Sequence, residues 1–288
     1  MSGSTGLSPL QSYLSYSANE AKYANAAAVG NAQQTGLIDY FQANAGTITT
    51  PAALLKNYKA LSVVLGAFGV GNLIGSTALV QQLLTQDPTS KSSVAYRIGN
   101  AKYLAFATAL HSWSPPPFST ADGVNAIVTA YKTNNFEASA NTQSAGLQNA
   151  LYFTRMAKSI TTVTQLQSDS SLLAVAVTGI GLPLTAYDNL AFSQQTALLT
   201  QKLNLANLQK PAYVQHLAEL YLVQQQLTAG TQVQKPQAGS VASLFSGSAT
   251  SGDSVLTILE DSNGGGTSSL LGANTSGTAT NSLLSLFA

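Results

Sequence analysis

The sequence contains no cysteine among its 288 residues, so it can form neither a disulfide nor a thiolate metal site. Charge is also scarce: Asp, Glu, Lys and Arg make up 8% of the chain, whereas about 25% is usual for soluble domains. The net charge of +1 provides no global field to attract nucleic acid or an anionic membrane. We therefore predict no nucleic-acid partner.

Long hydrophobic runs are almost absent as well. Residues 61–80 carry no charge and are numerous enough to cross a bilayer. Gly66, Gly69, Gly71 and Gly75 interrupt this segment, so we interpret it as buried core and predict no membrane span. The first ten residues include no basic residue and no apolar run, and we therefore expect no cleavable secretory signal.

The side chains that usually carry catalysis are few and scattered. His111 and His216 are the two histidines, and we expect the first to cap a helix end and the second to lie on an outer helix face. Apart from Glu260-Asp261 the acids are isolated, and no familiar nucleophile, phosphate-loop or zinc motif occurs. We predict no catalytic, cofactor-binding or metal-binding residue, no cofactor and no enzymatic activity.

The chain repeats one stretch of its own sequence. When the sequence is shifted by 112 positions, the residues that coincide include Tyr40-Phe41 with Tyr152-Phe153, Ile48-Thr49-Thr50 with Ile160-Thr161-Thr162, Leu54 with Leu166, and Gly69 with Gly181. The aromatic pair, the Ile-Thr-Thr turn and the glycine are too uncommon together to be a coincidence. An internal repeat of this kind predicts a fold made of two related units.

The repeated stretch has the start and stop signals of helices. Thr50 followed by Pro51 is typical of a helix start, because the Thr hydroxyl can cap free N–H groups and Pro suits the first helical position. Thr162 is its counterpart, while Gly69 and Gly181 lie where a helix would end in a left-handed residue. The residues to which we assign a structural role are Thr50, Pro51, Gly69, Thr162, Gly181 and Pro183.

Apolar residues recur at helical spacing, and no window alternates with period two between hairpin turns. The predicted fold is all-α, a helical bundle built from two sequence-related repeats and followed by a disordered tail. The predicted segments are a disordered N-terminus (1–8), a first repeat (9–113), a Pro-rich linker (114–118), a second repeat (119–231) and a disordered tail rich in Ser, Gly and Thr (232–288).

Several finer features are also predicted. Helices should begin after the caps Ser76, Asn100, either Ser119 or Thr120, and Asp188, and the third of these helices should run towards Lys158. The tyrosines Tyr40, Tyr103, Tyr152 and Tyr213 fit half-buried helix faces on which the hydroxyl reaches water.

The tail has short apolar pairs among its polar residues. Leu283-Leu284 and Leu286-Phe287 each follow a serine. Short apolar anchors in disordered chains commonly fold on a partner, so these residues are possible docking points for a protein partner. They are equally compatible with hydrophobic residues scattered through a solvated tail.

The repeated block resembles a known family, domain-of-unknown-function family 1217, found in alphaproteobacteria and often linked to flagellar genes. The residues that carry the resemblance are Tyr40-Phe41, Ile48-Thr49-Thr50, Leu54-Leu55, the segment from Leu61 to Val70, Ser93 to Phe106, Ala150 to Phe153, Ile160 to Leu166, Asp169 to Pro183 and Gln194 to Leu205. The family usually has an acid where this chain has Asn57 and Asn100. The resemblance implies a helical flagellum-associated protein without catalytic residues.

Three functions remain open at this stage. The first is a non-enzymatic structural or assembly protein of the bacterial flagellum that acts through contacts with flagellar components or export machinery. The second is a secreted or surface helical binding protein unrelated to motility, and the third is an enzyme of unfamiliar type. The expected location is the flagellum or the cell exterior, reached by signal-less export, with the cytoplasm as the alternative.

Overall fold

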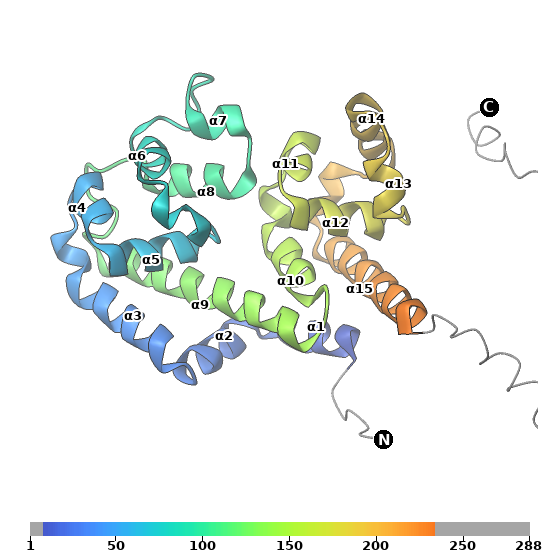
Figure 1. Cartoon of the computed structure of the whole chain (residues 1–288), viewed down its shortest axis with the longest axis horizontal. Helices are drawn as coiled ribbons and strands as arrows, with labels where there is room; N and C mark the ends of the chain where they lie inside the picture. Colours follow the sequence, from blue (N-terminus) through green and yellow to red (C-terminus); the bar gives the residue numbers. More distant parts are fainter. Residues whose placement is uncertain (1–7, 234–288) are drawn as a thin grey trace, which may run out of the picture. The chain divides into compact units, whose positions relative to one another are not determined.

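The computed structural model describes residues 8–233, and within that range the fold is all-helical without any β-strand (Figure 1). The α-helices of the first half are α1 (Pro9–Ala18), α2 (Glu20–Val29), α3 (Ala32–Asn44), α4 (Pro51–Lys56), α5 (Tyr58–Ala67), α6 (Thr77–Thr85), α7 (Val94–Ile98) and α8 (Ala101–Leu110). Those of the second half are α9 (Ala121–Gln143), α10 (Leu147–Met156), α11 (Val163–Gln167), α12 (Ser170–Gly179), α13 (Leu184–Asp188), α14 (Phe192–Lys202) and α15 (Pro211–Val233). Short 3-10 turns connect them at η1 (Ala45–Thr47), η2 (Gly71–Gly75), η3 (Ala157–Ser159) and η4 (Leu205–Gln209).

Polar side chains start most of the helices by accepting hydrogen bonds from free backbone N–H groups. The Thr50 hydroxyl accepts from the N–H of Ala53, and the Thr162 hydroxyl accepts from the N–H of Gln165. Asn100 and Thr120 cap α8 and α9 in the same manner. Each such cap contributes about 1 kcal/mol to helix stability.

Some predicted helix boundaries were wrong. Ser8, expected in a disordered segment, caps α1. Asp188 ends α13 and does not begin a helix; α14 begins at Phe192, where the Gln194 side chain accepts from the Ala191 N–H. Ser76 precedes α6, but its side chain makes no capping bond there.

The helix predicted from Thr120 towards Lys158 is divided into α9 and α10. Ser144 has an extended backbone and Gly146 has a positive φ of 85°, which breaks the run of helical residues. A side chain is disfavoured at that φ, and a Cβ added at Gly146 would lie 3.0 Å from Tyr221. The break turns α10 away from the end of α9 (Figure 1).

Two helix ends share one hydrogen-bond pattern. After α5, Gly69 has φ of 66°, its N–H donates to the Gly66 carbonyl, and the Val70 N–H donates to the Leu65 carbonyl. After α12, Gly181 has φ of 83°, and the same two bonds form from Gly181 to Thr178 and from Leu182 to Val177. Both are Schellman turns that satisfy carbonyls left free at a helix end.

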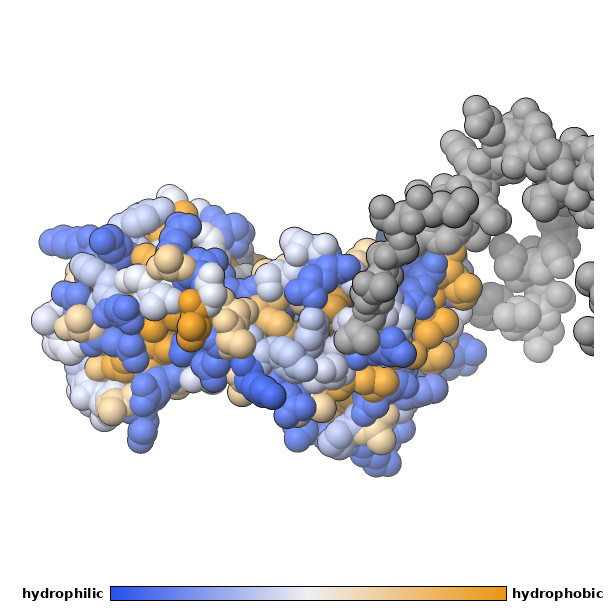
Figure 2. All heavy atoms as spheres, turned by 90° about the horizontal axis from the view of Figure 1, so that it is seen from below, coloured by the Kyte–Doolittle hydropathy of each residue, from blue (hydrophilic) through white to orange (hydrophobic). Residues whose placement is uncertain are grey.

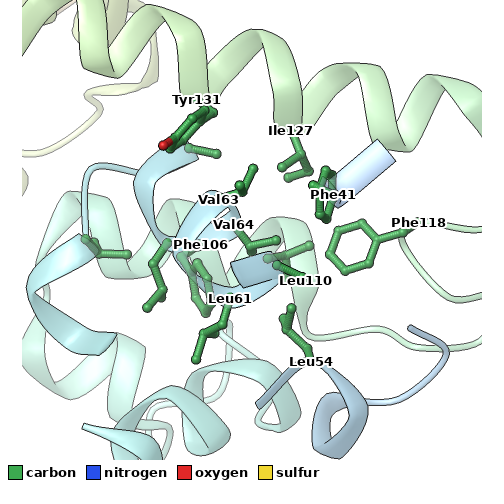
Figure 3. Close-up of a cluster of buried hydrophobic side chains, with 14 of the residues drawn as sticks. Phe41, Leu54, Leu61, Val63, Val64, Phe106, Leu110, Phe118, Ile127 and Tyr131 are labelled. Atoms are coloured by element: carbon green, nitrogen blue, oxygen red, sulfur yellow. The ribbon is translucent and has the colours of Figure 1, made fainter. Parts of the chain in front are cut away.

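The first hydrophobic core lies among α3–α8 and the first half of α9 (Figure 3). Phe41, Leu54, Val63 and Phe106 are fully buried in it, and α9 contributes Ile127, Val128 and Tyr131. A helix that the sequence assigned to the second repeat thus completes the core of the first.

The predicted Pro-rich linker 114–118 ends within this core. Phe118 is 2% exposed and its ring packs edge-on against both Phe41 and Trp113. The indole N–H of Trp113 donates to the Leu84 carbonyl. The segment is therefore attached to the first core and is not a free spacer, because an aromatic side chain this large is stabilised by burial.

The second core lies among α1, α2, the second half of α9, α10, α12 and α15. Tyr13 from α1 is fully buried there, although its position is near the start of the chain. A smaller third cluster joins Val163, Val177, Tyr187 and Leu199 from α11 to α14. Helix α9 runs past both larger cores and connects them (Figure 1).

The uncharged segment 61–80 is divided among α5, η2 and α6. Val63, Val64 and Leu65 are fully buried in the first core. Among residues 8–233, no helix is both long and apolar enough to cross a bilayer.

Candidate functional site

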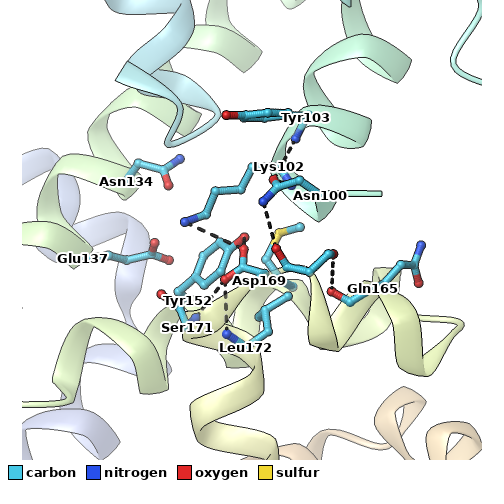
Figure 4. Close-up of polar contacts among 12 residues, drawn as sticks. Asn100, Lys102, Tyr103, Asn134, Glu137, Tyr152, Gln165, Asp169, Ser171 and Leu172 are labelled. Atoms are coloured by element: carbon cyan, nitrogen blue, oxygen red, sulfur yellow. Dashed lines mark hydrogen bonds and ion pairs between the residues drawn. The ribbon is translucent and has the colours of Figure 1, made fainter. Parts of the chain in front are cut away.

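Charged side chains gather where the two larger cores meet, which is unexpected in a chain with so little charge. Figure 4 shows part of this cluster, between α8, α9, α10 and α12. Its charged members are Glu20, Lys102, Glu137, Arg155 and Asp169. We call these residues, together with Tyr152, the polar cluster.

Asp169 lies at the start of α12 and is 4% exposed. Its Oδ1 accepts from the backbone N–H groups of Ser171 and Leu172. Its Oδ2 accepts from the Tyr152 hydroxyl at 2.9 Å and lies 3.8 Å from the Lys102 ammonium. A buried carboxylate is costly without donors, and here a helix cap, a phenol and a cation supply them together.

Tyr152 lies between two cations. The Lys102 ammonium is 4.6 Å from the ring centroid, and the Arg155 guanidinium is 5.3 Å from it. Burial raises the pKa of the Tyr152 hydroxyl far above its usual value, and the Asp169 carboxylate adds to this rise. The phenol therefore stays protonated and donates to Asp169. The prediction that its hydroxyl reaches water was wrong.

Arg155 forms a two-point ion pair with Glu137. Its Nε and Nη2 donate to the two carboxylate oxygens at 2.7 and 2.8 Å, and Nη2 also donates to Asn134 Oδ1 at 3.0 Å. Glu137 is 2% exposed. The geometry is the planar fork that makes Arg suited to carboxylates, and it fastens α10 to α9.

Glu20 is the first residue of α2 and faces the same pair. Its Oε1 is buried and has no hydrogen-bond partner among the described residues. Burial and then the neighbouring Glu137 carboxylate raise the pKa of Glu20, Arg155 opposes the rise, and the net pKa is about 7. The carboxylates of Glu20 and Glu137 both lie beside Arg155, and the repulsion between them favours the protonated form of Glu20.

A second set of bonds links the two halves beside Asp169. The Asn100 side chain caps α8 and also donates to the Ser168 carbonyl at 3.0 Å. The Ser168 hydroxyl donates to the Gly99 carbonyl at 2.6 Å. The turn before α8 and the turn before α12 are therefore held together directly.

The two histidines lie apart from the polar cluster. His111 Nδ1 is 3.0 Å from the Ala107 carbonyl at the end of α8, in the helix-end position predicted from the sequence. His216 is exposed on α15. Within the described range, no group of three or more His, Asp or Glu side chains could hold a metal ion.

The residues predicted to be structural lie at helix ends, away from the cluster. Thr50 and Thr162 are caps, Pro51 is the first residue of α4, Gly69 and Gly181 form the two Schellman turns, and Pro183 precedes α13. The predicted docking residues Leu283, Leu284, Leu286 and Phe287 lie outside the described residues.

Sequence reasoning missed the polar cluster because its acids are far apart in the chain. One signal was available: Arg155 lies between Phe153 and Met156, within a stretch rich in large apolar residues. A charged residue at such a position is rarely buried without a partner. The pairing itself depends on tertiary contacts between α9, α10 and α12.

The chain is similar in structure to protein AGR_C_984 from Agrobacterium tumefaciens, solved by X-ray crystallography. The TM-score is 0.65 at 20% sequence identity, over 74% of this chain and 90% of that chain, so the likeness is one of fold. Among curated proteins, none matches the sequence. The family described as "Protein of unknown function (DUF1217)" matches residues 67–214, a stretch that includes every member of the polar cluster except Glu20. That match covers half of the chain, and the protein therefore belongs to the DUF1217 family.

Proposed function

We propose that the protein is a non-enzymatic structural or assembly component of the bacterial flagellum, acting through protein–protein contacts. The flagellar context rests on what the resemblance of the repeated block implies. The contact role rests on one observation: large apolar side chains lie on the surface while the charged cluster is bonded to itself.

The exposed apolar residues lie on several helices. Val29 is 82% exposed at the end of α2, and Phe192 is 66% exposed at the start of α14. Figure 2 shows hydrophobic residues in separate patches among hydrophilic ones on the face seen from below. Contiguous exposed apolar patches are typical of interaction surfaces, and this is the basis for the proposed contact role.

The two Schellman turns support a further part of the proposal, that the chain is built from two sequence-related helical halves. Gly69 and Gly181 are separated by the same 112 positions as the other repeated residues, and both close a buried apolar helix. In this proposal each half contributes a helix to the core of the other half. Helix α9 completes the first core, and α1 packs into the second.

Deletion of the gene tests the flagellar assignment. A deletion strain should lose swimming or filament formation, and the full chain supplied in trans should restore it. Normal swimming and normal filaments in a clean deletion would overturn the assignment.

Phe192→Asp tests the contact role, since it places a charge on an exposed apolar position of α14. The variant should fold like the wild type but fail to restore swimming. Gln33→Asp, which adds the same charge at an exposed polar position of α3, is the matched control. Equal restoration by both variants would count against a contact surface at Phe192.

A secreted or surface binding protein unrelated to motility is the competing proposal, and the scarcity of charge suits it equally well. Fractionation of an epitope-tagged strain that lacks the flagellar export gate separates the two. Export that requires the gate supports the flagellar assignment, whereas export without it supports the surface binder.

A further inference from the structure

A cleft of about 250 Å³ opens beside the polar cluster, between the end of α5, α9, α10 and the start of α12. Lys102, Asn135, Glu137, Gln148, Tyr152 and Ser171 contribute to its lining. In Figure 4 the Lys102 ammonium points into the space between the ring of Tyr152 and the side chains of Asn134 and Glu137. This volume is below the roughly 300–1,000 Å³ of sites for drug-sized ligands, so a single small group fits it.

Most polar groups around the cleft are already bonded to each other. Both Glu137 oxygens accept from Arg155. The Tyr152 hydroxyl donates to Asp169, and the Asn134 amide donates to the Ala67 and Ala130 carbonyls. These groups shape the cleft but have no donor left for a ligand.

The Asn135 amide donates to the Tyr131 carbonyl. The other three side chains with donors are Lys102, Gln148 and Ser171. The Lys102 ammonium has its nearest carboxylate oxygen at 3.8 Å, beyond hydrogen-bond distance, and its side chain is 27% exposed. The side chains of Gln148 and Ser171 make no hydrogen bond to any residue in the described range. The Tyr152 ring lies against the ammonium and holds it at the cleft.

The remaining donors define the chemistry of a ligand. An ammonium, an amide and a hydroxyl together suit a group that has negative charge and several acceptor oxygens. The carboxylates of Glu137 and Asp169 lie nearby and disfavour a dianion such as phosphate. A singly charged carboxylate meets both conditions.

We propose that this cleft binds one carboxylate, with Lys102 as the counter-charge and with Gln148 and Ser171 as neutral donors. The carboxylate can come from a free small acid or from an acidic side chain of a protein partner. The inference goes beyond the proposed function and does not depend on it, because binding is measured on the purified chain alone.

The test is a titration of the full-length protein with propionate, a singly charged carboxylate, monitored by two-dimensional amide NMR. Saturable shifts are expected at the amides of Lys102, Gln148 and Ser171, whereas propionamide, the neutral analogue, should give none. A blocked Ala-Asp-Ala tripeptide, compared with its Ala-Asn-Ala form, distinguishes the sources. Binding of the acidic tripeptide indicates a protein side chain; binding of propionate alone indicates a free acid.

Lys102→Met keeps the aliphatic stem over the Tyr152 ring and removes the charge. It should weaken propionate binding roughly tenfold to hundredfold, the value of one charge-assisted hydrogen bond. Lys59→Met is the matched control, because the Lys59 ammonium also lies over a tyrosine ring, 4.9 Å from the Tyr40 centroid, but on the surface. The control should bind propionate as the wild type does.

Gln148→Leu provides a second variant that leaves the Lys102–Asp169 pair in place if Lys102→Met fails to fold. It should weaken propionate binding several-fold. The proposal is overturned if propionate gives no saturable shift, if propionamide gives the same shifts, or if every one of these two variants that folds binds propionate like the wild type.

Discussion

Replacement of Glu20 by glutamine should make the protein more stable at alkaline pH and leave it almost unchanged at acidic pH. The Glu20 carboxyl is half-buried beside Glu137, with one oxygen lacking a partner among the described residues. Burial, followed by the charge of Glu137, raises its pKa from 4.5 to about 7. Glutamine has a similar shape, cannot ionise, and can donate to the Glu137 carboxylate.

The direction of this pH dependence of stability follows from proton linkage. The folded state holds the Glu20 proton more tightly than the unfolded state, so the stabilising effect of this group is complete below pH 4.5. It is lost as the pH rises through the range from 4.5 to about 7. This pKa difference corresponds to about 3 kcal/mol, and solvent screening of a half-buried group reduces that to about 1–2 kcal/mol.

Urea denaturation of the wild type and of Glu20→Gln between pH 4 and pH 8 measures this effect. The variant should exceed the wild type by about 1–2 kcal/mol at pH 8, with the difference vanishing towards pH 4. Asp39→Asn, which removes a carboxylate from an exposed position of α3, controls for the change in net charge. Parallel stability profiles for the wild type and Glu20→Gln would refute the reasoning.

Four further substitutions test the fold. Asp169→Ala removes a cap and the partner of Lys102 and should cost about 3–5 kcal/mol in urea denaturation. Phe118→Ala should cost about 3–5 kcal/mol because the ring is buried in the first core; a loss below 1 kcal/mol would restore the linker interpretation. Gly181→Ala should cost about 1 kcal/mol, since its φ is 83° while no atom lies within 4 Å of the added Cβ. Gly36→Ala, in the interior of α3 with the same open space, should instead stabilise the protein by about 0.5–1 kcal/mol in the same assay.

Features that depend on a few neighbouring residues could be predicted from the sequence. Asn100 and Thr120 cap helices because their side chains reach N–H groups two or three residues later. Gly69 and Gly181 end helices because glycine enters a positive φ at little cost. Asp188 was predicted to begin a helix from its side chain alone, but it ends α13, and α14 begins after Ala191.

The polar cluster could not be predicted in this way. Lys102 and Asp169 are 67 positions apart, and Glu20 and Glu137 are separated further still. Each acid looked isolated in the sequence because its partner lies on another helix. The same holds for Tyr152, whose repeated counterpart Tyr40 is half-buried, whereas Tyr152 is buried under two cations.

The sequence by itself determined that the described chain is helical and where most of its helices begin and end. It also determined the family to which the chain belongs. These features could be predicted because caps, periodicity and motif spacing are local properties. Only the tertiary structure decided how these helices share their cores. Helix α9 completes the first core, and α1 packs into the second. That packing brings the few buried charges together, since a buried charge is tolerated only where another element supplies its partner.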